Sequence, residues 1–184
     1  AGIHTITYTA TDINGNTSSA SFTITVVDNI PPTITGCNNI TVNATNGTCS
    51  AVVSYVQPIP RDNCSGVSMT INNPAYLPGN VFPVGIHTVV YTATDVAGNV
   101  TTCSFTVTVI DATPPVITCP APVVVSNDLN QCGAIVNYPF PATATDDCPG
   151  VVTITYSPAS GSFFPVGNTI VTATAEDAAG NTAT

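Results

Sequence analysis

A repeated sequence constrains this chain more than any other feature. The segment GIHTITYTATDINGN at 2–16 returns as GIHTVVYTATDVAGN at 85–99 and as GNTIVTATAEDAAGN at 167–181. A second block follows the first two copies, as SFTITVVDNIPPTIT at 21–35 and SFTVTVIDATPPVIT at 104–118. The copies start 83 and then 82 residues apart. A fixed period of this kind is the signature of a chain built from consecutive structural units.

The period also predicts where the units begin and end. We expect residues 31–112 to form one complete unit, residues 1–30 to be the C-terminal strands of a preceding unit, and residues 113–184 to be a unit that lacks its last strand. The position equivalent to Cys103 would be residue 185, one past the last residue. The odd cysteine count of seven therefore needs no free reactive thiol.

The local pattern within a unit is that of short, half-buried β-strands. Phe105, Val107 and Val109 alternate with small polar residues, which places the apolar side chains on one face of a strand. Sixteen prolines and thirteen glycines interrupt the chain at short intervals, which suits many strands and disfavours helices. About seven such strands per unit predict an all-β fold of tandem immunoglobulin-like β-sandwich repeats of about 83 residues. A small barrel is the alternative.

The charge balance excludes several classes of partner. The chain has one basic residue, Arg61, against ten acidic residues, and a net charge of −9. Binding of nucleic acid requires a basic surface, so we expect no nucleic-acid partner. An anionic membrane surface is disfavoured by the same argument, and no apolar run approaches the roughly 20 residues of a membrane span, so this segment should not insert into a membrane. Seven cysteines without a Cys-x-x-Cys pair indicate disulfides and an extracellular location.

Several motifs in a fixed order resemble the HYR (hyalin repeat) family. They are Pro-Pro-x-Ile-Thr-x-Cys, Asp-Asn-Cys, Phe-Pro-Val-Gly, Tyr-Thr-Ala-Thr-Asp-x-x-Gly-Asn and Cys-Ser-Phe-Thr-Val-Thr-Val, and the resemblance covers essentially the whole chain. It implies immunoglobulin-like modules of extracellular proteins, implicated in cell adhesion and often arranged in long arrays on bacterial surface proteins. The chain departs from the pattern at Ala173, where the other copies have Tyr8 and Tyr91, and at Ala20, which replaces Cys103.

Four cysteines in the complete unit allow three disulfide pairings. The first and last strands run side by side, so their starts should lie at the same end, which favours Cys37 with Cys103 and leaves Cys49 with Cys64. In the last unit the same rule pairs Cys132 with Cys148 and leaves Cys119 for residue 185. Each bridge should stabilise its unit by roughly 2–4 kcal/mol.

Aspartates recur before each Pro-Pro pair, before the cysteine of one loop, and at the start of the hairpin turn. In a sandwich of this order these positions face the preceding unit, so three carboxylates could converge at each junction and bind Ca²⁺. The simpler interpretation is that each aspartate starts a turn by accepting hydrogen bonds from nearby backbone, and we favour it because no dense Asp-x-Asp loop is present. The Ca²⁺ candidates are Asp28, Asp62 and Asp95, then Asp111, Asp147 (or Asp146) and Asp177.

No arrangement of residues predicts an enzyme. His4 and His87 occupy equivalent positions, but the third copy has Asn168 there, and no nucleophile, base and acid recur around them. Glu176 and Asp177 are adjacent on a strand, so their side chains point to opposite faces.

The sequence therefore predicts a structural or adhesive, non-enzymatic segment of a long extracellular surface protein or filament. Its partners would be the neighbouring repeats and copies of itself. Short Pro-Pro linkers should make the array a stiff stalk. The alternatives are a module that binds a glycan or a protein, for which Tyr76 in the insertion at 72–78 is the candidate residue, and an accessory domain of a secreted hydrolase.

Overall fold

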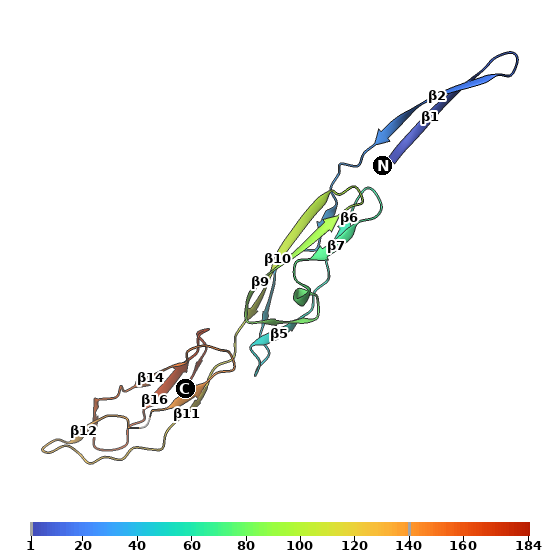
Figure 1. Cartoon of the computed structure of the whole chain (residues 1–184). Coiled ribbons are helices and arrows are strands. Elements are labelled where there is room, and N and C mark those ends of the chain that lie inside the picture. The colour runs from blue at the N-terminus through green and yellow to red at the C-terminus, as the bar shows by residue number, and fades with distance from the viewer. Residues whose placement is uncertain (1, 140) are drawn as a thin grey trace. The chain divides into compact units, whose positions relative to one another are not determined.

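The computed structural model describes residues 2–139 and 141–184. The described chain is built from β-strands, with one short 3₁₀ helix, η1 (Pro74–Tyr76). The strands are β1 (Gly2–Thr11), β2 (Thr17–Val26), β3 (Thr33–Thr35), β4 (Ile40–Asn43), β5 (Ser50–Val53), β6 (Ile59–Arg61), β7 (Ser68–Ile71), β8 (Asn80–Pro83), β9 (Gly85–Thr94), β10 (Val100–Ile110), β11 (Val116–Thr118), β12 (Gly133–Val136), β13 (Thr143–Thr145), β14 (Thr153–Ser157), β15 (Ser162–Pro165), β16 (Thr172–Glu176) and β17 (Thr182–Ala183) (Figure 1). The predicted all-β class is confirmed.

The chain divides into two compact structural units, whose boundaries differ from those of the sequence repeats. The first consists of residues 1–40, 54–80 and 88–107, and the second of residues 41–53, 81–87 and 108–184. The middle part of the chain contains a four-stranded sheet in the order β4-β10-β9-β7, with two smaller pairs, β3-β6 and β5-β8. Short strands distributed over several small sheets are the arrangement of an immunoglobulin-like sandwich.

The predicted alternation along the two long strands is confirmed by burial. Val89, Tyr91 and Ala93 of β9 are buried, as are Phe105 and Val107 of β10, while the residues between them are partly exposed. Burial of one face therefore fixes the register of these strands, because a slip of one residue would turn every apolar side chain to water.

The first unit contains an aromatic cluster under these strands. The rings of Tyr91 and Phe105 lie with centroids 6.4 Å apart, and Tyr55 meets Phe105 edge-on at 5.2 Å. The hydroxyls of Tyr55 and Tyr91 are 3.0 Å apart, and the Tyr55 hydroxyl donates to the carbonyl of Tyr76. Burial raises the pKa of the Tyr55 phenol, and its hydrogen bond with Tyr91 adds to the shift.

The second unit contains the strands of the last repeat. They form the pairs β11-β13 and β12-β15 and a three-stranded sheet in the order β14-β16-β17. Within that sheet Tyr156 of β14 lies opposite Ala173 of β16. Tyr138 packs edge-on against Tyr156, with ring centroids 5.3 Å apart, and its hydroxyl donates to the carbonyl of Pro158 at 2.6 Å.

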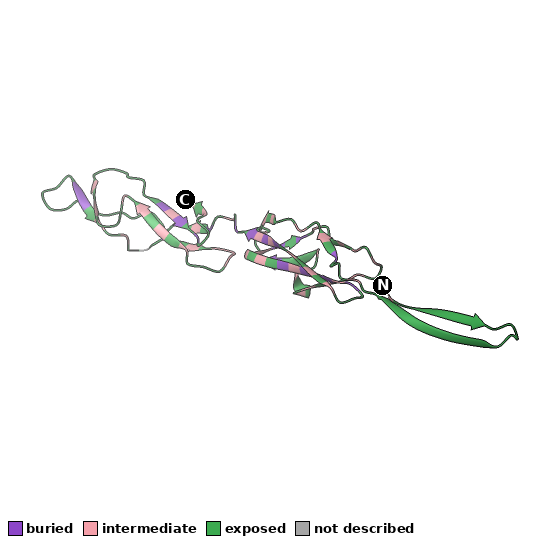
Figure 2. Cartoon of the chain, turned by 90° about the horizontal axis from the view of Figure 1, so that it is seen from above, coloured by how far each residue is buried: buried purple, intermediate pink, exposed green. Residues whose placement is uncertain are grey.

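The N-terminal hairpin of β1 and β2 is exposed along its whole length (Figure 2). Its residues are the sequence equivalents of β9 and β10, yet Tyr8 is 66% exposed whereas Tyr91 is 1% exposed. Burial in this fold therefore depends on the surrounding strands and not on the sequence of the hairpin alone. Strands equivalent to β4 and β7 do not cover β1 and β2 in the described part of the chain.

Candidate functional site at the repeat junctions

Each long hairpin turns through the same five-residue motif, Asp-x-x-Gly-Asn. In the turn between β9 and β10, Asp95 Oδ1 accepts the backbone N–H of Asn99 at 2.8 Å, and Asp95 Oδ2 accepts the Asn99 side-chain amide at 2.8 Å. Asp177 and Asn181 repeat both contacts, at 2.8 and 2.9 Å. The glycine takes a positive φ, 91° at Gly98, which a Cβ would strain. The sequence-based interpretation of these aspartates as turn formers agrees with this geometry.

The asparagine of this turn also holds the linker that enters the repeat. The Asn99 side-chain amide donates to the carbonyl of Asp28 at 3.3 Å, and that of Asn181 donates to the carbonyl of Asp111 at 3.3 Å. The second proline of each following Pro-Pro pair, Pro32 or Pro115, is buried. The same polar contact therefore fixes the linker backbone at both repeat boundaries.

The hydrogen bonds of the turn keep its aspartate ionised. Asp95 and Asp177 are both 7% exposed, and their partial desolvation alone would raise the pKa. Hydrogen bonds from the side chain and backbone of the following asparagine outweigh this effect, so the pKa of both carboxyls is lowered. In the exposed first hairpin, the hydrogen bond from the Asn16 side chain is the main cause of the lowered pKa of Asp12.

The structure brings together only part of each predicted Ca²⁺ set. Asp28 and Asp62 lie with Cys64 in a group whose ligand atoms are within 4.8 Å of one another. Asp95 is not part of that group. At the next junction the group is Asp111, Asp146, Asp147 and Cys148, and the predicted Asp177 is likewise not part of it. Both carboxylate oxygens of Asp95 and of Asp177 accept hydrogen bonds within their own turns.

The structural equivalent of Asp62 in the last repeat is Asp146, and not Asp147. Asp62 Oδ2 accepts the backbone N–H of Cys64 at 2.9 Å, and Asp146 Oδ2 accepts that of Cys148 at 2.8 Å. Asp147 Oδ2 instead accepts the backbone N–H of Gly47 at 2.8 Å. Asp62 and Asp146 each lie two residues before the cysteine of their loop, and this spacing is the sequence signal for their equivalence.

Three carboxylate oxygens in these groups are buried without a hydrogen-bond partner in the described structure. They are Oδ1 of Asp62, Asp146 and Asp147. A buried charged oxygen without a partner is costly. These atoms are therefore the places in the acidic groups where a cation would be held.

One predicted disulfide is present in the structure. Cys37 is bonded to Cys103, with Cα atoms 6.3 Å apart. Next to this bridge the Asn39 side chain accepts the backbone N–H of Thr106 at 2.9 Å. The segment before β4 thus runs beside β10, as the prediction of neighbouring first and last strands required.

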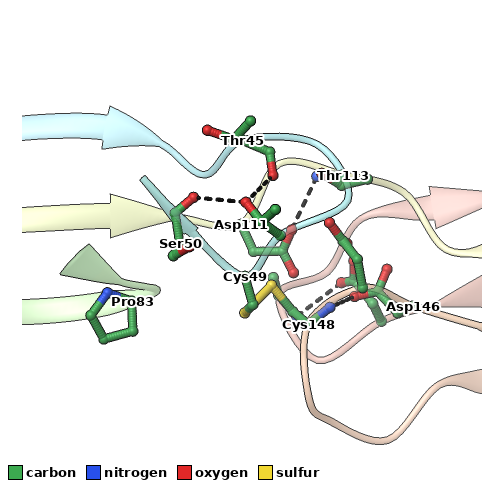
Figure 3. Close-up of a disulfide and its surroundings, with 12 residues drawn as sticks. Thr45, Cys49, Ser50, Pro83, Asp111, Thr113, Asp146 and Cys148 are labelled. Carbon is green, nitrogen blue, oxygen red and sulfur yellow. Dashed lines mark hydrogen bonds between the residues drawn. A yellow bond between two sulfur atoms is a disulfide. The ribbon is translucent and has the colours of Figure 1, made fainter. Parts of the chain in front are cut away.

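The other predicted pairings are wrong. Cys49 is bonded to Cys148 of the next repeat, with Cα atoms 4.7 Å apart, and not to Cys64 (Figure 3). Cys132, predicted to pair with Cys148, is unbonded in the structure. The Cys49 turn lies where the chain leaves the repeat, because Ala44 just before it donates to the carbonyl of Ile110 at 2.8 Å. Cys64 lies where the chain enters the repeat, beside Asp28.

The other residues that the sequence singled out are the two histidines and Tyr76. His87 Nε2 lies 2.7 Å from the carbonyl of Pro83, within hydrogen-bonding distance, and His4 stands on the exposed strand β1. The insertion that carries Tyr76 forms η1, whose first turn is capped by Asn73. No helix of the described residues has the length and apolar character needed to span a membrane.

The last repeat contains a cavity of about 760 Å³. Its lining includes residues 119–127 and, later in the chain, Val171 and Ala173. In the middle repeat the equivalent segments are β4 and β9, and β10 lies between them in the sheet. The cavity is thus at the place that β10 occupies in the preceding repeat, which explains its apolar valine lining without a ligand.

These features define a class: tandem immunoglobulin-like β-repeats joined through short linkers, with one disulfide within a repeat and one between two repeats. The model of the HYR domain matches residues 27–109 and 110–184. The chain belongs to the HYR domain family, a family of adhesion-type repeats rather than enzymes.

Curated relatives agree with this family. The chain is 38% identical to "Hyalin" of Lytechinus variegatus over 97% of its length and 34% of that protein, and 37% identical to "Hyalin" of Strongylocentrotus purpuratus over 98% and 15%. It is 34% identical to "Sushi, von Willebrand factor type A, EGF and pentraxin domain-containing protein 1" of Rattus norvegicus over 83% of this chain and 4% of that one. The chain thus spans about a third or less of each relative. Among solved structures, it is similar to the protocadherin GammaB4 extracellular domain with a TM-score of 0.44 and 15% identity, over 98% of this chain and 36% of that one.

Proposed function

We propose that this chain is a non-enzymatic, adhesive repeat segment of a long extracellular surface protein, in which consecutive HYR repeats form a stiff stalk. Family membership and the hyalin relatives support the extracellular, adhesion-type assignment. The observation that carries the stalk is the linker contact. At both boundaries the turn asparagine, Asn99 or Asn181, donates to the carbonyl of the aspartate that precedes the Pro-Pro pair.

The linker chemistry supports stiffness for a physical reason. Each proline fixes its own φ and restricts the residue before it, so the Pro-Pro pair has few accessible conformations. The Asp28 side chain accepts the N–H of Ile30 at 3.2 Å, and the Asp111 side chain accepts that of Thr113 at 3.1 Å. A linker held by its own prolines, its own aspartate and the turn asparagine leaves little freedom for bending.

Small-angle scattering tests this proposal. Chains of increasing repeat number should show a maximum dimension that rises by about 40 Å for each repeat, given the ~3.3 Å rise per residue of the long strands. Matched chains with Asn99→Ala and Asn181→Ala should be more compact on average, with a broader distance distribution. A maximum dimension that rises only as the square root of repeat number in the unaltered array would contradict a stiff stalk.

Binding of Ca²⁺ at the junctions is a second candidate, favoured by the buried oxygens without a partner. Asp111, Asp146 and Asp147 offer three carboxylates, and Ca²⁺ prefers oxygen ligands of this kind. Cys148 of this group is in a disulfide and would not act as a ligand. The remaining carboxylates suit Ca²⁺, because Oδ1 of Asp146 and Oδ1 of Asp147 are buried without a hydrogen bond and would gain the cation as a partner.

Thermal unfolding with Ca²⁺ and with a chelator tests this candidate. We expect Ca²⁺ to raise the melting temperature, and Asp146→Asn with Asp147→Asn to abolish the increase. Glu176→Gln, an exposed acidic residue outside both groups, serves as the control that keeps the increase. Equal melting temperatures in Ca²⁺ and chelator would remove the candidate and leave the stalk proposal intact.

A further inference from the structure

We propose that disulfides join successive repeats of this array at a regular interval, and that Cys49–Cys148 is one step of a series that continues through Cys64 and Cys132. The bridge connects the two segments matched by the HYR model, 27–109 and 110–184. Its two cysteines are 99 residues apart, more than one repeat period. A bond of this kind can recur at every boundary of a periodic chain.

The turn that carries Cys132 is the same as the turn that carries Cys49. In the first turn Thr45 donates to the carbonyl of Ser50 at 2.8 Å, and Thr48 donates back to Thr45 at 2.9 Å. In the second, Asp128 donates to Gly133 at 2.8 Å, and Gln131 donates back to Asp128 at 3.0 Å.

The carbonyl groups of the two cysteines are also used alike. The carbonyl of Cys49 accepts the N–H of Val84 at 3.1 Å, and that of Cys132 accepts the N–H of Val166 at 3.1 Å. Cys132 is exposed and unbonded. It is therefore presented by the same backbone as Cys49, the cysteine that reaches the next repeat.

The loop that carries Cys64 is likewise the same as the loop that carries Cys148. Both cysteines donate their backbone N–H to the aspartate two residues earlier. Both loops also contain a glycine pressed against the hairpin turn. A Cβ on Gly66 would lie 2.5 Å from Val96, and one on Gly150 would lie 2.6 Å from Ala178. Cys64 is thus placed to receive a Cys49-type cysteine from a preceding repeat.

The interval predicts the partners. Cys132 would pair with a cysteine about 99 residues later in the array, and Cys64 with one about 99 residues earlier. Cys119 occupies the position of Cys37, so it would pair with a Cys103-type cysteine 66 residues later, within its own repeat. The two intervals together account for all three unbonded cysteines of the described chain.

Formation of each bridge is an oxidation. Two cysteine thiols lose two protons and two electrons, and a low-molecular-weight disulfide accepts them and leaves as two thiols.

Two variants of this chain distinguish disulfides between successive repeats from disulfides within each repeat. After folding with oxidised and reduced glutathione, thiols are alkylated in denaturant and bridges are mapped by mass spectrometry under non-reducing conditions. The series predicts that Cys64→Ser leaves Cys49 bonded, and that Cys148→Ser frees Cys49. Bridges within each repeat predict the reverse: Cys64→Ser frees Cys49, and Cys148→Ser frees Cys132. That reverse result would overturn the proposal.

A lengthened chain tests the next step of the series. Thr184 aligns with Thr102, so a second copy of residues 103–184 attached after Thr184 continues the period. In the added copy, Cys132→Ser removes a second cysteine of the Cys132 type, which could compete for the same partner. In the same copy, Val152→Ile changes the mass of the peptide that contains Cys148, so that it can be distinguished from the Cys148 peptide of the original chain. We expect Cys132 of the original chain to bond with the marked Cys148. A Cys132 that stays alkylated, or that bonds within its own repeat, contradicts the series even if Cys49–Cys148 forms.

Discussion

Tyr156 lies directly opposite Ala173 across β14 and β16, at the register position where Ile71 lies opposite Tyr91 across β7 and β9. The aromatic side chain has moved to the neighbouring strand, and the residue across from it has become smaller. In both repeats this tyrosine meets a second tyrosine, Tyr55 or Tyr138. The loss of the repeated tyrosine at Ala173 is therefore compensated within the same sheet.

This relationship predicts a rescue in the middle repeat. Tyr91→Ala should lower the free energy of unfolding by about 3–5 kcal/mol, because a buried aromatic is removed. Adding Ile71→Tyr should recover a substantial part of that loss by recreating the arrangement of the last repeat. Ile71→Tyr alone should destabilise by about 1–3 kcal/mol through overpacking. Urea unfolding of the three variants measures the coupling, and strictly additive effects would show that the two positions do not exchange roles.

The hairpin aspartates predict loss of stability in acid. The pKa of Asp95 and of Asp177 is lower in the folded chain than the ordinary value of 3.8. Their contribution is therefore complete above that ordinary value and is lost as the pH falls through the lowered folded values. We expect an unfolding midpoint that changes little from pH 7 to about pH 5 and falls below about pH 4.

The matched variants for the acid experiment are Asp95→Asn with Asp177→Asn, and Glu176→Gln as the control. The double variant should be less stable at neutral pH, and its midpoint should depend less on pH below about pH 4. Glu176 is exposed, so its substitution should leave the profile unchanged. A wild-type profile retained by the double variant would show that other carboxyls cause the acid transition.

The linker contact predicts a local change in hydrogen exchange. Asn99→Ala should increase amide exchange at residues 28–30 and 33, and Asn181→Ala should do so at 111–113 and 116, because each removes a bond to the linker carbonyl. Asn16→Ala is the matched control, since Asn16 makes the same turn bonds to Asp12 in the exposed first hairpin. It should leave exchange at both linkers unchanged. Equal exchange in all three variants would show that the prolines alone hold the linkers.

The cavity of the last repeat predicts that one further strand stabilises it. Attaching a second copy of residues 103–112 after Thr184 supplies equivalents of Phe105, Val107 and Val109, which are buried in β10. Burial of three such side chains should add on the order of 5 kcal/mol to the stability of this repeat. The control segment carries serine at those three positions. If both segments stabilise equally, the cavity does not receive the apolar face of a strand.

The period and the alternation of apolar residues were sufficient to predict the long strands and the all-β class. The Cys37–Cys103 bridge followed from the expected strand order, in which the first and last strands are neighbours. They did not predict β6, where Pro60 lies within the strand and removes a backbone donor, so the segment resembles a loop. β6 pairs only with β3, which tolerates the proline at an edge.

The pairing of Cys49 could not be obtained from the strand order of one repeat. Strand order indicates which strands are neighbours within a sandwich, whereas Cys49 bonds across a boundary. The assignment of Asp147 had a different origin, because the sequence itself places Asp62 and Asp146 each two residues before their cysteine. The hydrogen bonds from Cys64 to Asp62 and from Cys148 to Asp146 follow that spacing.

The Cys49–Cys148 bridge encloses the Pro-Pro linker at 114–115 in a covalent loop. A protease that cuts the backbone anywhere between these cysteines opens the loop but does not separate the two sides, which stay joined through sulfur. An array with such a loop at every boundary would lose its continuity only after a cut and a reduction at the same place. Damage from proteolysis alone would then leave its length intact.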